Sequence, residues 1–160
     1  MLLSTLAFSF CGILVQPVES QSFESIYIRA DGSVEGTDKI QREEDVYTLI
    51  SDINASIVVE RDNVVLNGAS YILQGDGNVN GITLDDIRYT TVKNLKLSCF
   101  NIGILVMGSD NNKILEITIT DSFRGLDLTA SENNTVSGSY IANNEMASPL
   151  KIRITTSLKT

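Results

Sequence analysis

Three aspartates, Asp85, Asp86 and Asp127, are the residues whose type and spacing best suit acid–base chemistry. Hydrolysis of a glycosidic bond uses two carboxyl groups, which lie about 6.5–9.5 Å apart when the reaction inverts the sugar. β-Elimination instead needs a basic side chain beside a calcium-binding carboxylate group, and Arg88 and Arg124 are the bases near these aspartates. Ordinary surface ion pairs explain the same residues equally well. Whether these residues catalyse hydrolysis, catalyse elimination or form only surface ion pairs therefore depends on the elements that position the carboxylates.

The composition excludes several other kinds of chemistry. The chain has no histidine and two cysteines, Cys11 and Cys99, which removes histidine-based triads, histidine-ligated zinc and a multi-disulfide framework. Its formal net charge of −8 argues against nucleic acid as the main partner. Asp76 and Asn78 offer too few ligands for calcium, so a plain turn is the better interpretation there. We expect no cofactor and no metal site, and we interpret Cys99 as a small buried residue rather than a reactive thiol.

A repeat of 22 residues positions the aspartates. Three segments align without a gap: NGITLDD at 80–86, IGILVMG at 102–108 and RGLDLTA at 124–130. The repeats contain short β-branched runs with two-residue alternation, separated by turn-forming residues. Their shared glycine suits a place where the chain bends sharply or approaches itself closely. Asn112 and Asn134, in equivalent turns, are expected to pair between repeats.

This repeat predicts an all-β fold, a right-handed parallel β-helix of about five coils. Equivalent residues of successive coils then stack about 4.8 Å apart. The right-handed sense follows from strand twist and from the crossover preference of parallel strands. A leucine-rich repeat has a similar length, but its LxxLxLxxN pattern and helical half are missing. Two columns are expected to point inward: Ile82, Ile104 and Leu126, and Leu84, Val106 and Leu128.

The two ends of the chain differ from the repeats. Residues 2–15 carry no charge and are too few to span a bilayer about 30 Å thick, so we expect no transmembrane helix and interpret residues 1–20 as a signal peptide. A buried amino-terminal strand or helix is the alternative. Residues 21–55 are expected to form an amino-terminal cap and the first strands, and residues 56–146 the parallel β-helix repeats. Residues 147–160 form either a final strand or an irregular, truncated end, which would leave the last coil uncapped and open to end-to-end self-association.

Several strings of this sequence resemble a known family. They are SIYIRADGSVEG and YTLISDINASIVVERDNVVLNGASYILQGDG, followed by NGITL, VKNLKL, IGILV and DNNKI. Over about residues 25–146 the chain resembles the NosD-like β-helix proteins, part of the carbohydrate-binding and sugar-hydrolase repeat class with the pectin-lyase-like fold. The resemblance implies the fold, but these repeats serve hydrolases, lyases, epimerases, adhesins and accessory proteins alike. NosD is linked to copper-site maturation, yet a chain without histidine offers little for a copper site.

The resemblance implies that any catalytic acids would occupy outward strand positions. Asp85 and Asp127 lie two coils apart, with Leu105 and Met107 between them, which is a poor lining for a hydrolytic site. We therefore expect a non-catalytic protein that is secreted, periplasmic or exposed at the cell surface and that binds polysaccharide or a cell-envelope glycan, or serves as a structural module. The alternative is a polysaccharide lyase or glycoside hydrolase that uses Asp85, Asp86 and Asp127. A third reading is an envelope spacer without a ligand.

Two further sets of residues are expected to lie on the surface. An outward polar strip of Asn80, Thr83, Arg124 and Asp127 is the candidate glycan contact. Asn54 and Asn133 begin Asn-x-Ser/Thr triplets, Asn54-Ala55-Ser56 and Asn133-Asn134-Thr135, and are candidate glycosylation sites if the exporting cell glycosylates such motifs.

Overall fold

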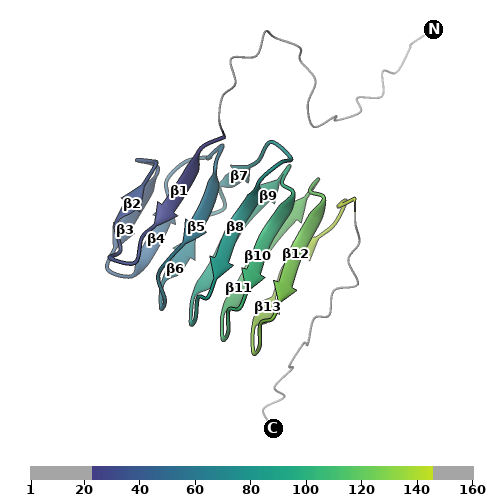
Figure 1. Cartoon of the computed structure of the whole chain (residues 1–160). Coiled ribbons are helices and arrows are strands. Elements are labelled where there is room, and N and C mark those ends of the chain that lie inside the picture. Colours follow the sequence, from purple (N-terminus) through teal and green to yellow (C-terminus); the bar gives the residue numbers. More distant parts are fainter. Residues whose placement is uncertain (1–22, 146–160) are drawn as a thin grey trace, which may run out of the picture.

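The computed structural model describes residues 23–145, and this part of the chain is a solenoid of β-strands without a helix (Figure 1). The predicted parallel β-helix architecture is confirmed. Residues 1–22 and 146–160 lie outside the described part. The signal peptide expected at 1–20, the irregular end expected at 147–160 and self-association through an uncapped last coil therefore stay predictions.

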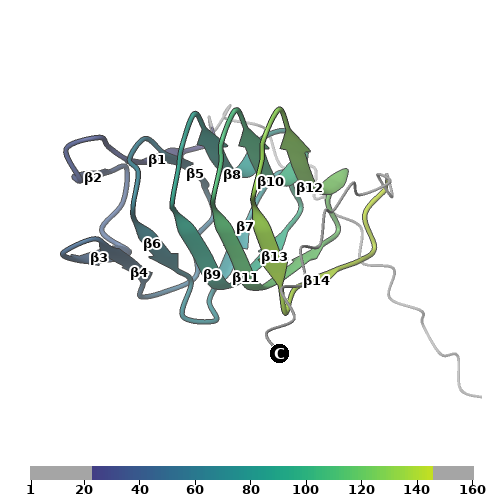
Figure 2. The same ribbon diagram turned by 90° about the horizontal axis from the view of Figure 1, so that it is seen from below.

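Two sheets form the walls of the solenoid. The front sheet has the strand order β12-β10-β8-β5-β1-β2, and the back sheet has the order β13-β11-β9-β6-β4-β3, with β7 and β14 paired to β9 and β11. Figure 2 shows the chain passing repeatedly from one wall to the other. The strand bounds are β1 Ser25–Ile28, β2 Val34–Glu35, β3 Ile40–Glu43, β4 Val46–Leu49, β5 Ser56–Val59, β6 Val65–Asn67, β7 Ile72–Gln74, β8 Asn80–Asp85, β9 Thr91–Ser98, β10 Ile102–Met107, β11 Lys113–Thr120, β12 Arg124–Thr129, β13 Thr135–Ser137 and β14 Tyr140–Ile141.

The number of residues between paired positions in the front sheet gives the length of each turn. Ile26, Ile57, Ile82, Ile104 and Leu126 are successive Cα partners, so the described residues contain five strand levels and four full turns. The last two turns contain 22 residues each, as the repeat predicts, whereas the first two contain 31 and 25. The first turn is longer because, besides the back-sheet strand β4, the segment between β1 and β5 forms the antiparallel strands β2 and β3.

The core is the space between the two walls. Ile82, Leu84, Ile104 and Val106 are each 0% exposed, and Leu126 is 3% exposed, so the predicted inward columns are confirmed at these positions. Inward side chains of β9 and β11 meet them from the back sheet. Burial of these aliphatic columns, at about 25 cal/mol for each Å² of apolar surface, supplies the main stabilisation of the stack.

The repeated glycine lies where neighbouring coils come closest. A Cβ atom on Gly81 would lie 2.5 Å from the carbonyl oxygen of Gly103, and one on Gly103 would lie 2.6 Å from that of Gly125. Neither backbone adopts the left-handed conformation. Close approach, not a sharp bend, is therefore the reason for this glycine column.

Left-handed residues make the sharp corners instead. Asn94 in β9, Glu116 in β11 and Gly138 have φ angles of 52°, 55° and 63°, and they follow one another at 22-residue intervals. The corner at Asn94 allows one half of β9 to pair with β6 and the other half with β7. The back sheet is therefore folded along a line of stacked corners.

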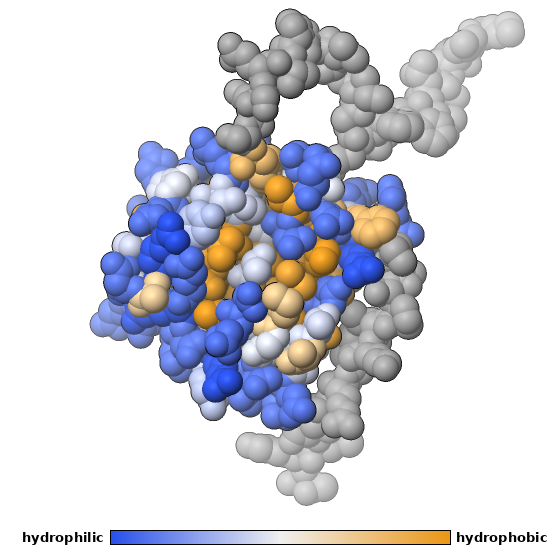
Figure 3. Space-filling view, in the orientation of Figure 1, coloured by the Kyte–Doolittle hydropathy of each residue, from blue (hydrophilic) through white to orange (hydrophobic). Residues whose placement is uncertain are grey.

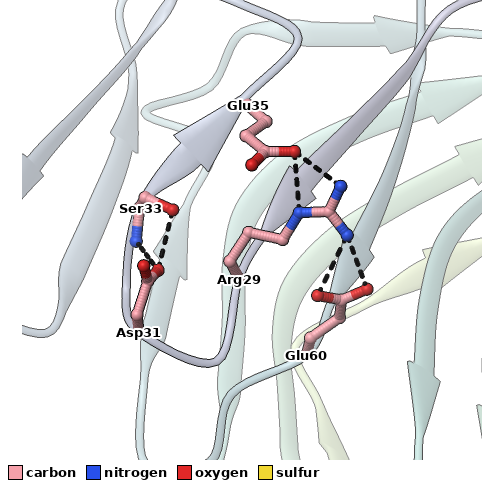
Figure 4. A network of polar contacts seen from close by, with 5 residues as sticks. All are labelled: Arg29, Asp31, Ser33, Glu35 and Glu60. Atoms are coloured by element: carbon pink, nitrogen blue, oxygen red, sulfur yellow. Dashed lines mark hydrogen bonds and ion pairs between the residues drawn. The ribbon is translucent and has the colours of Figure 1, made fainter.

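Two antiparallel pairs close the amino end of the stack. β2 runs antiparallel to β1, and β3 runs antiparallel to β4. Arg29 fastens the first pair, because its Nε donates to Glu35 Oε2 at 2.8 Å and its Nη1 donates to Glu60 Oε1 at 3.0 Å (Figure 4). The buried Tyr47 of β4 donates its hydroxyl to the carbonyl oxygen of Gly32 at 2.9 Å, which joins the two pairs. Short reversed strands of this kind limit pairing with other chains.

Candidate functional site

The outer surface of the front sheet, here called the front face, carries the residues expected to bind or react. Three rows of Cα partners cross β8, β10 and β12, and each row is polar on β8, apolar on β10 and polar on β12. The rows are Asn80, Ile102 and Arg124; Thr83, Leu105 and Asp127; and Asp85, Met107 and Thr129. Figure 3 shows the result over the front sheet, where apolar side chains lie among polar ones.

The polar group on β12 is bonded within itself. Arg124 Nη1 donates to Asp127 Oδ2 at 2.9 Å, and Thr129 Oγ1 donates to Asp127 Oδ1 at 2.8 Å. The Arg124 and Asp127 side chains are 35% and 21% exposed. Arg124 Nε is buried and has no hydrogen-bond partner among the described residues, so part of the donor capacity of Arg124 is not used. Both carboxylate oxygens of Asp127 are already engaged.

The polar group on β8 is open. Asn80, Thr83 and Asp85 make no side-chain hydrogen bond or ion pair to other residues in the range 23–145. Asn80 and Thr83 are half-buried and Asp85 is exposed. Their polar atoms are therefore available to a ligand.

The predicted polar strip of four residues is divided in two. Asn80 and Thr83 lie on β8, Arg124 and Asp127 lie on β12, and the apolar strand β10 runs between them. Strands separated by one neighbour are about 9.6 Å apart. The front face thus has two polar edges on either side of an apolar row formed by Ile102, Leu105 and Met107.

The aspartates considered for acid chemistry occupy three different settings. Asp85 and Asp127 are separated by β10 and offset by two residues along the strands, which places their Cα atoms about 12 Å apart at ideal spacing. Asp86 has a left-handed backbone with φ of 54° at the turn that follows β8, and its side chain is 85% exposed beside Arg88. Asp127 is held by hydrogen bonds from two neighbouring side chains, whereas Asp86 has only a 3.9 Å ion pair with Arg88.

A pocket of about 370 Å³ lies beside the front face, at the corner that leads into β10 and β12. Its acidic side chains come from the 76–77 loop, the turn before β12 and the end of the described chain. Phe123 is 40% exposed at this pocket, whereas Phe100 is 1% exposed. The residues that matter for its chemistry are Asp76, Phe100, Asn101, Asp121, Phe123 and Glu145.

Sequence reasoning missed this corner pocket, although the repeat contained a signal for it. Asn101, Phe123 and Glu145 follow one another at 22-residue intervals and occupy equivalent places after the back-sheet strands. These three residues lie outside the strands, so the alternation of apolar and polar residues within strands does not identify them.

The remaining candidates lie away from the front face. Asn54 and Asn133 are exposed outside the strands, and Asn133 has a left-handed backbone with φ of 56°. Glycosylation of either residue stays a prediction. Cys99 is 8% exposed and is not a free thiol.

The comparisons with known proteins identify the family. Residues 24–156 match the model of the family described as periplasmic copper-binding protein (NosD). The chain belongs to the NosD family. No match was found among curated proteins or among solved structures. The NosD family is periplasmic, which agrees with the expectation of an exported protein. No helix capable of crossing a membrane occurs in residues 23–145.

The residues of this NosD-family chain do not fit the copper ion of the family's description. Histidine, cysteine and methionine are the side chains that bind copper best. The sequence contains no histidine, and Met107 and Cys99 are the soft donors within residues 23–145. Cys99 is buried and not free, and no cluster of three or more cysteine or carboxylate side chains in this range could hold a metal ion. We therefore assign no step of this protein's function to copper.

Proposed function

We propose that this NosD-family chain is a non-catalytic, exported β-helix that binds polysaccharide on its front face. The observation that carries the proposal is the pattern of the three rows, in which the apolar row of β10 lies between two polar edges. A sugar ring has an apolar C–H face and a rim of hydroxyl groups. The C–H face can lie on Leu105 and Met107, and the hydroxyl groups can then point toward β8 and β12.

Hydrogen-bonding groups at both edges support this orientation. Asn80 and Thr83 are open on β8, and the Arg124 side chain on β12 is 35% exposed. The edges lie about 9.6 Å apart, which is wide enough for one sugar chain on the apolar row. Parallel strands of a solenoid are rigid, so little ordering cost opposes binding.

Hydrolysis and elimination receive less support from the same geometry. Asp127 is engaged by Arg124 and Thr129, and Asp86 lies on a separate turn. The two carboxylates of a hydrolytic pair must act on one bond. Leu105 and Met107 lie between Asp85 and Asp127, which disfavours such a pair. We place the protein outside the cytoplasm, either in the periplasm or at the cell surface, with the mature chain starting near Gln21.

A glycan array with the purified protein tests the proposal, together with an assay for new reducing ends. Retention of at least one glycan without new reducing ends is the expected result. Met107→Ser and Arg124→Ala should each lower retention several-fold while the melting temperature stays nearly unchanged. Ile72→Ser is the matched control, because Ile72 is 37% exposed on β7 and Met107 is 39% exposed on the front face.

Three outcomes would contradict parts of the proposal. If no glycan is retained, polysaccharide binding is wrong and an envelope spacer replaces it. If Ile72→Ser weakens retention as much as Met107→Ser, the ligand does not lie on the front face. If new reducing ends appear and are lost in both Asp85→Asn and Asp127→Asn, the protein is a polysaccharide lyase or a glycoside hydrolase.

A further inference from the structure

We propose that the corner pocket binds an amino sugar residue of the glycan, a deeper statement that rests on the proposed function. The pocket directly adjoins the front face, because Asn101 precedes the first residue of β10 and Phe123 precedes the first residue of β12. A glycan that lies along the apolar row of β10 therefore has the pocket next to the row, at the start of the strand.

Phe123 supplies a fixed platform for a sugar ring. Phe123 is 40% exposed, although a large apolar residue is usually buried. Hydrogen bonds hold its backbone to the preceding coil, since Phe123 N donates to the carbonyl oxygen of Phe100 at 2.9 Å and Arg124 N donates to that of Asn101 at 2.8 Å. A partly exposed aromatic ring with a restrained backbone suits contact with the apolar face of a sugar.

The charges of the pocket select the kind of sugar. Asp76, Asp121 and Glu145 contribute three carboxylates, and no lysine or arginine of residues 23–145 lines the pocket. Asp121 and Glu145 make no side-chain hydrogen bond or ion pair within that range, so their charges are not compensated there. A protonated amino group complements these carboxylates, whereas the carboxylate of a uronic acid is repelled.

Arg124 does not cancel this selection. Its guanidinium carbon lies 6.0 Å from the centre of the Phe123 ring, but its charge is paired with Asp127 on the front face. The formal net charge of −8 for the whole chain acts in the same direction at long range, since it attracts a cationic glycan and repels an anionic one.

Calorimetric titration of the full chain with three hexasaccharides tests the inference. The probes are a glucosamine hexamer, its N-acetylated counterpart and a galacturonate hexamer, all at about pH 5, where the amino groups are protonated and the carboxylates of the pocket are ionised. The glucosamine hexamer should bind about tenfold more tightly than the acetylated one, and the galacturonate hexamer most weakly. Because the preference is electrostatic, it should shrink at high salt.

Paired variants separate the pocket from the net charge. Asp121→Asn with Glu145→Gln should remove the tenfold preference and leave the affinity for the acetylated hexamer unchanged. Glu43→Gln with Glu132→Gln removes two charges from exposed sites outside the pocket and should keep the preference. Phe123→Ala should lower the affinity for both the amino and the acetylated hexamer.

The failures of the two proposals are distinguishable. If glycans bind without a preference for amino groups, or if the pocket pair and the remote pair of variants behave alike, the amino-sugar pocket is wrong and binding on the front face stands. If none of these hexamers binds and the glycan array is empty, polysaccharide binding itself is wrong.

Discussion

The backbone N–H of Asn112 donates to the side-chain oxygen of Asn134, one coil further along, at 2.8 Å. Asn134 Nδ2 in turn donates to the carbonyl oxygen of Ser109 at 2.7 Å. The Asn112 side chain makes the same two hydrogen bonds to the preceding coil. Its Oδ1 accepts from Thr90 N and its Nδ2 donates to the carbonyl oxygen of Ile87, both at 2.8 Å. Each asparagine thus replaces the hydrogen bonds that a corner cannot make with another strand.

Substitution of Asn112 should therefore destabilise the solenoid. Asn112 is 1% exposed, and Asn112→Ala leaves one buried N–H and one buried carbonyl without partners, at about 1–3 kcal/mol each. We expect a loss of about 2–6 kcal/mol in the free energy of unfolding, measured by urea denaturation. Asn112→Asp keeps the acceptor for Thr90 N but buries a charge against the carbonyl oxygen of Ile87, so it should lose at least as much. Lys113→Ala, at the exposed neighbouring residue, should have little effect, and an equal loss there would refute this account.

Gly103→Ala should also destabilise the fold. The added Cβ would lie 2.6 Å from the carbonyl oxygen of Gly125 and 2.5 Å from Ile119 Cγ2, so two coils would have to separate. Overpacking of this kind costs about 1–3 kcal/mol. Thermal unfolding measures the loss. The control is Gly108→Asn, where φ is 57° and nothing lies within 4 Å, because asparagine tolerates that conformation. A melting temperature that stays constant in Gly103→Ala would show that the coils are less tightly stacked than described.

Acid should weaken the turn between β1 and β2. The amide of Ser33, with its hydroxyl, donates to Asp31 Oδ1 and lowers the pKa of that carboxyl below its ordinary value of 3.8. A lowered pKa in the folded state means that the stabilisation is present above about pH 4 and is lost as the pH falls through the folded pKa.

The isosteric Asp31→Asn variant isolates this effect because asparagine does not titrate. The difference in free energy of unfolding between the wild type and Asp31→Asn should be constant from pH 7 to pH 5. It should then decrease toward pH 2. A difference that grows on acidification would contradict the sign of the pKa shift.

Copper should not stabilise this protein. A specific site loaded at 100 times its dissociation constant adds about 2.7 kcal/mol to the free energy of unfolding. With no histidine in the chain, we expect the melting temperature to stay unchanged when Cu(I) or Cu(II) is added, and unchanged again after a chelator removes it. A copper-dependent rise in melting temperature that saturates at one equivalent would show that the chain has a specific copper site.

Much of the solenoid could be predicted from the spacing of residues alone. The intervals between Gly81, Gly103 and Gly125 define the turn, and alternation within each repeat assigned Ile104 and Val106 to the core, where both are 0% exposed. This works because parallel stacking forces residues one period apart into the same environment. The same argument placed Leu105 and Met107 between Asp85 and Asp127 on the front face.

The amino end and the corner pocket were decided by tertiary structure. The reversed strands β2 and β3 have no counterpart in the repeat, and the first two turns, of 31 and 25 residues, follow no common period. The pocket joins Asp76 of an irregular loop to Asp121 and Glu145 of regular corners. The alternation of apolar and polar residues predicts which side of a strand faces the core. It does not predict the direction of side chains at corners with left-handed backbones. Those directions arise only when the coils stack, because each corner takes its hydrogen bonds from the next coil.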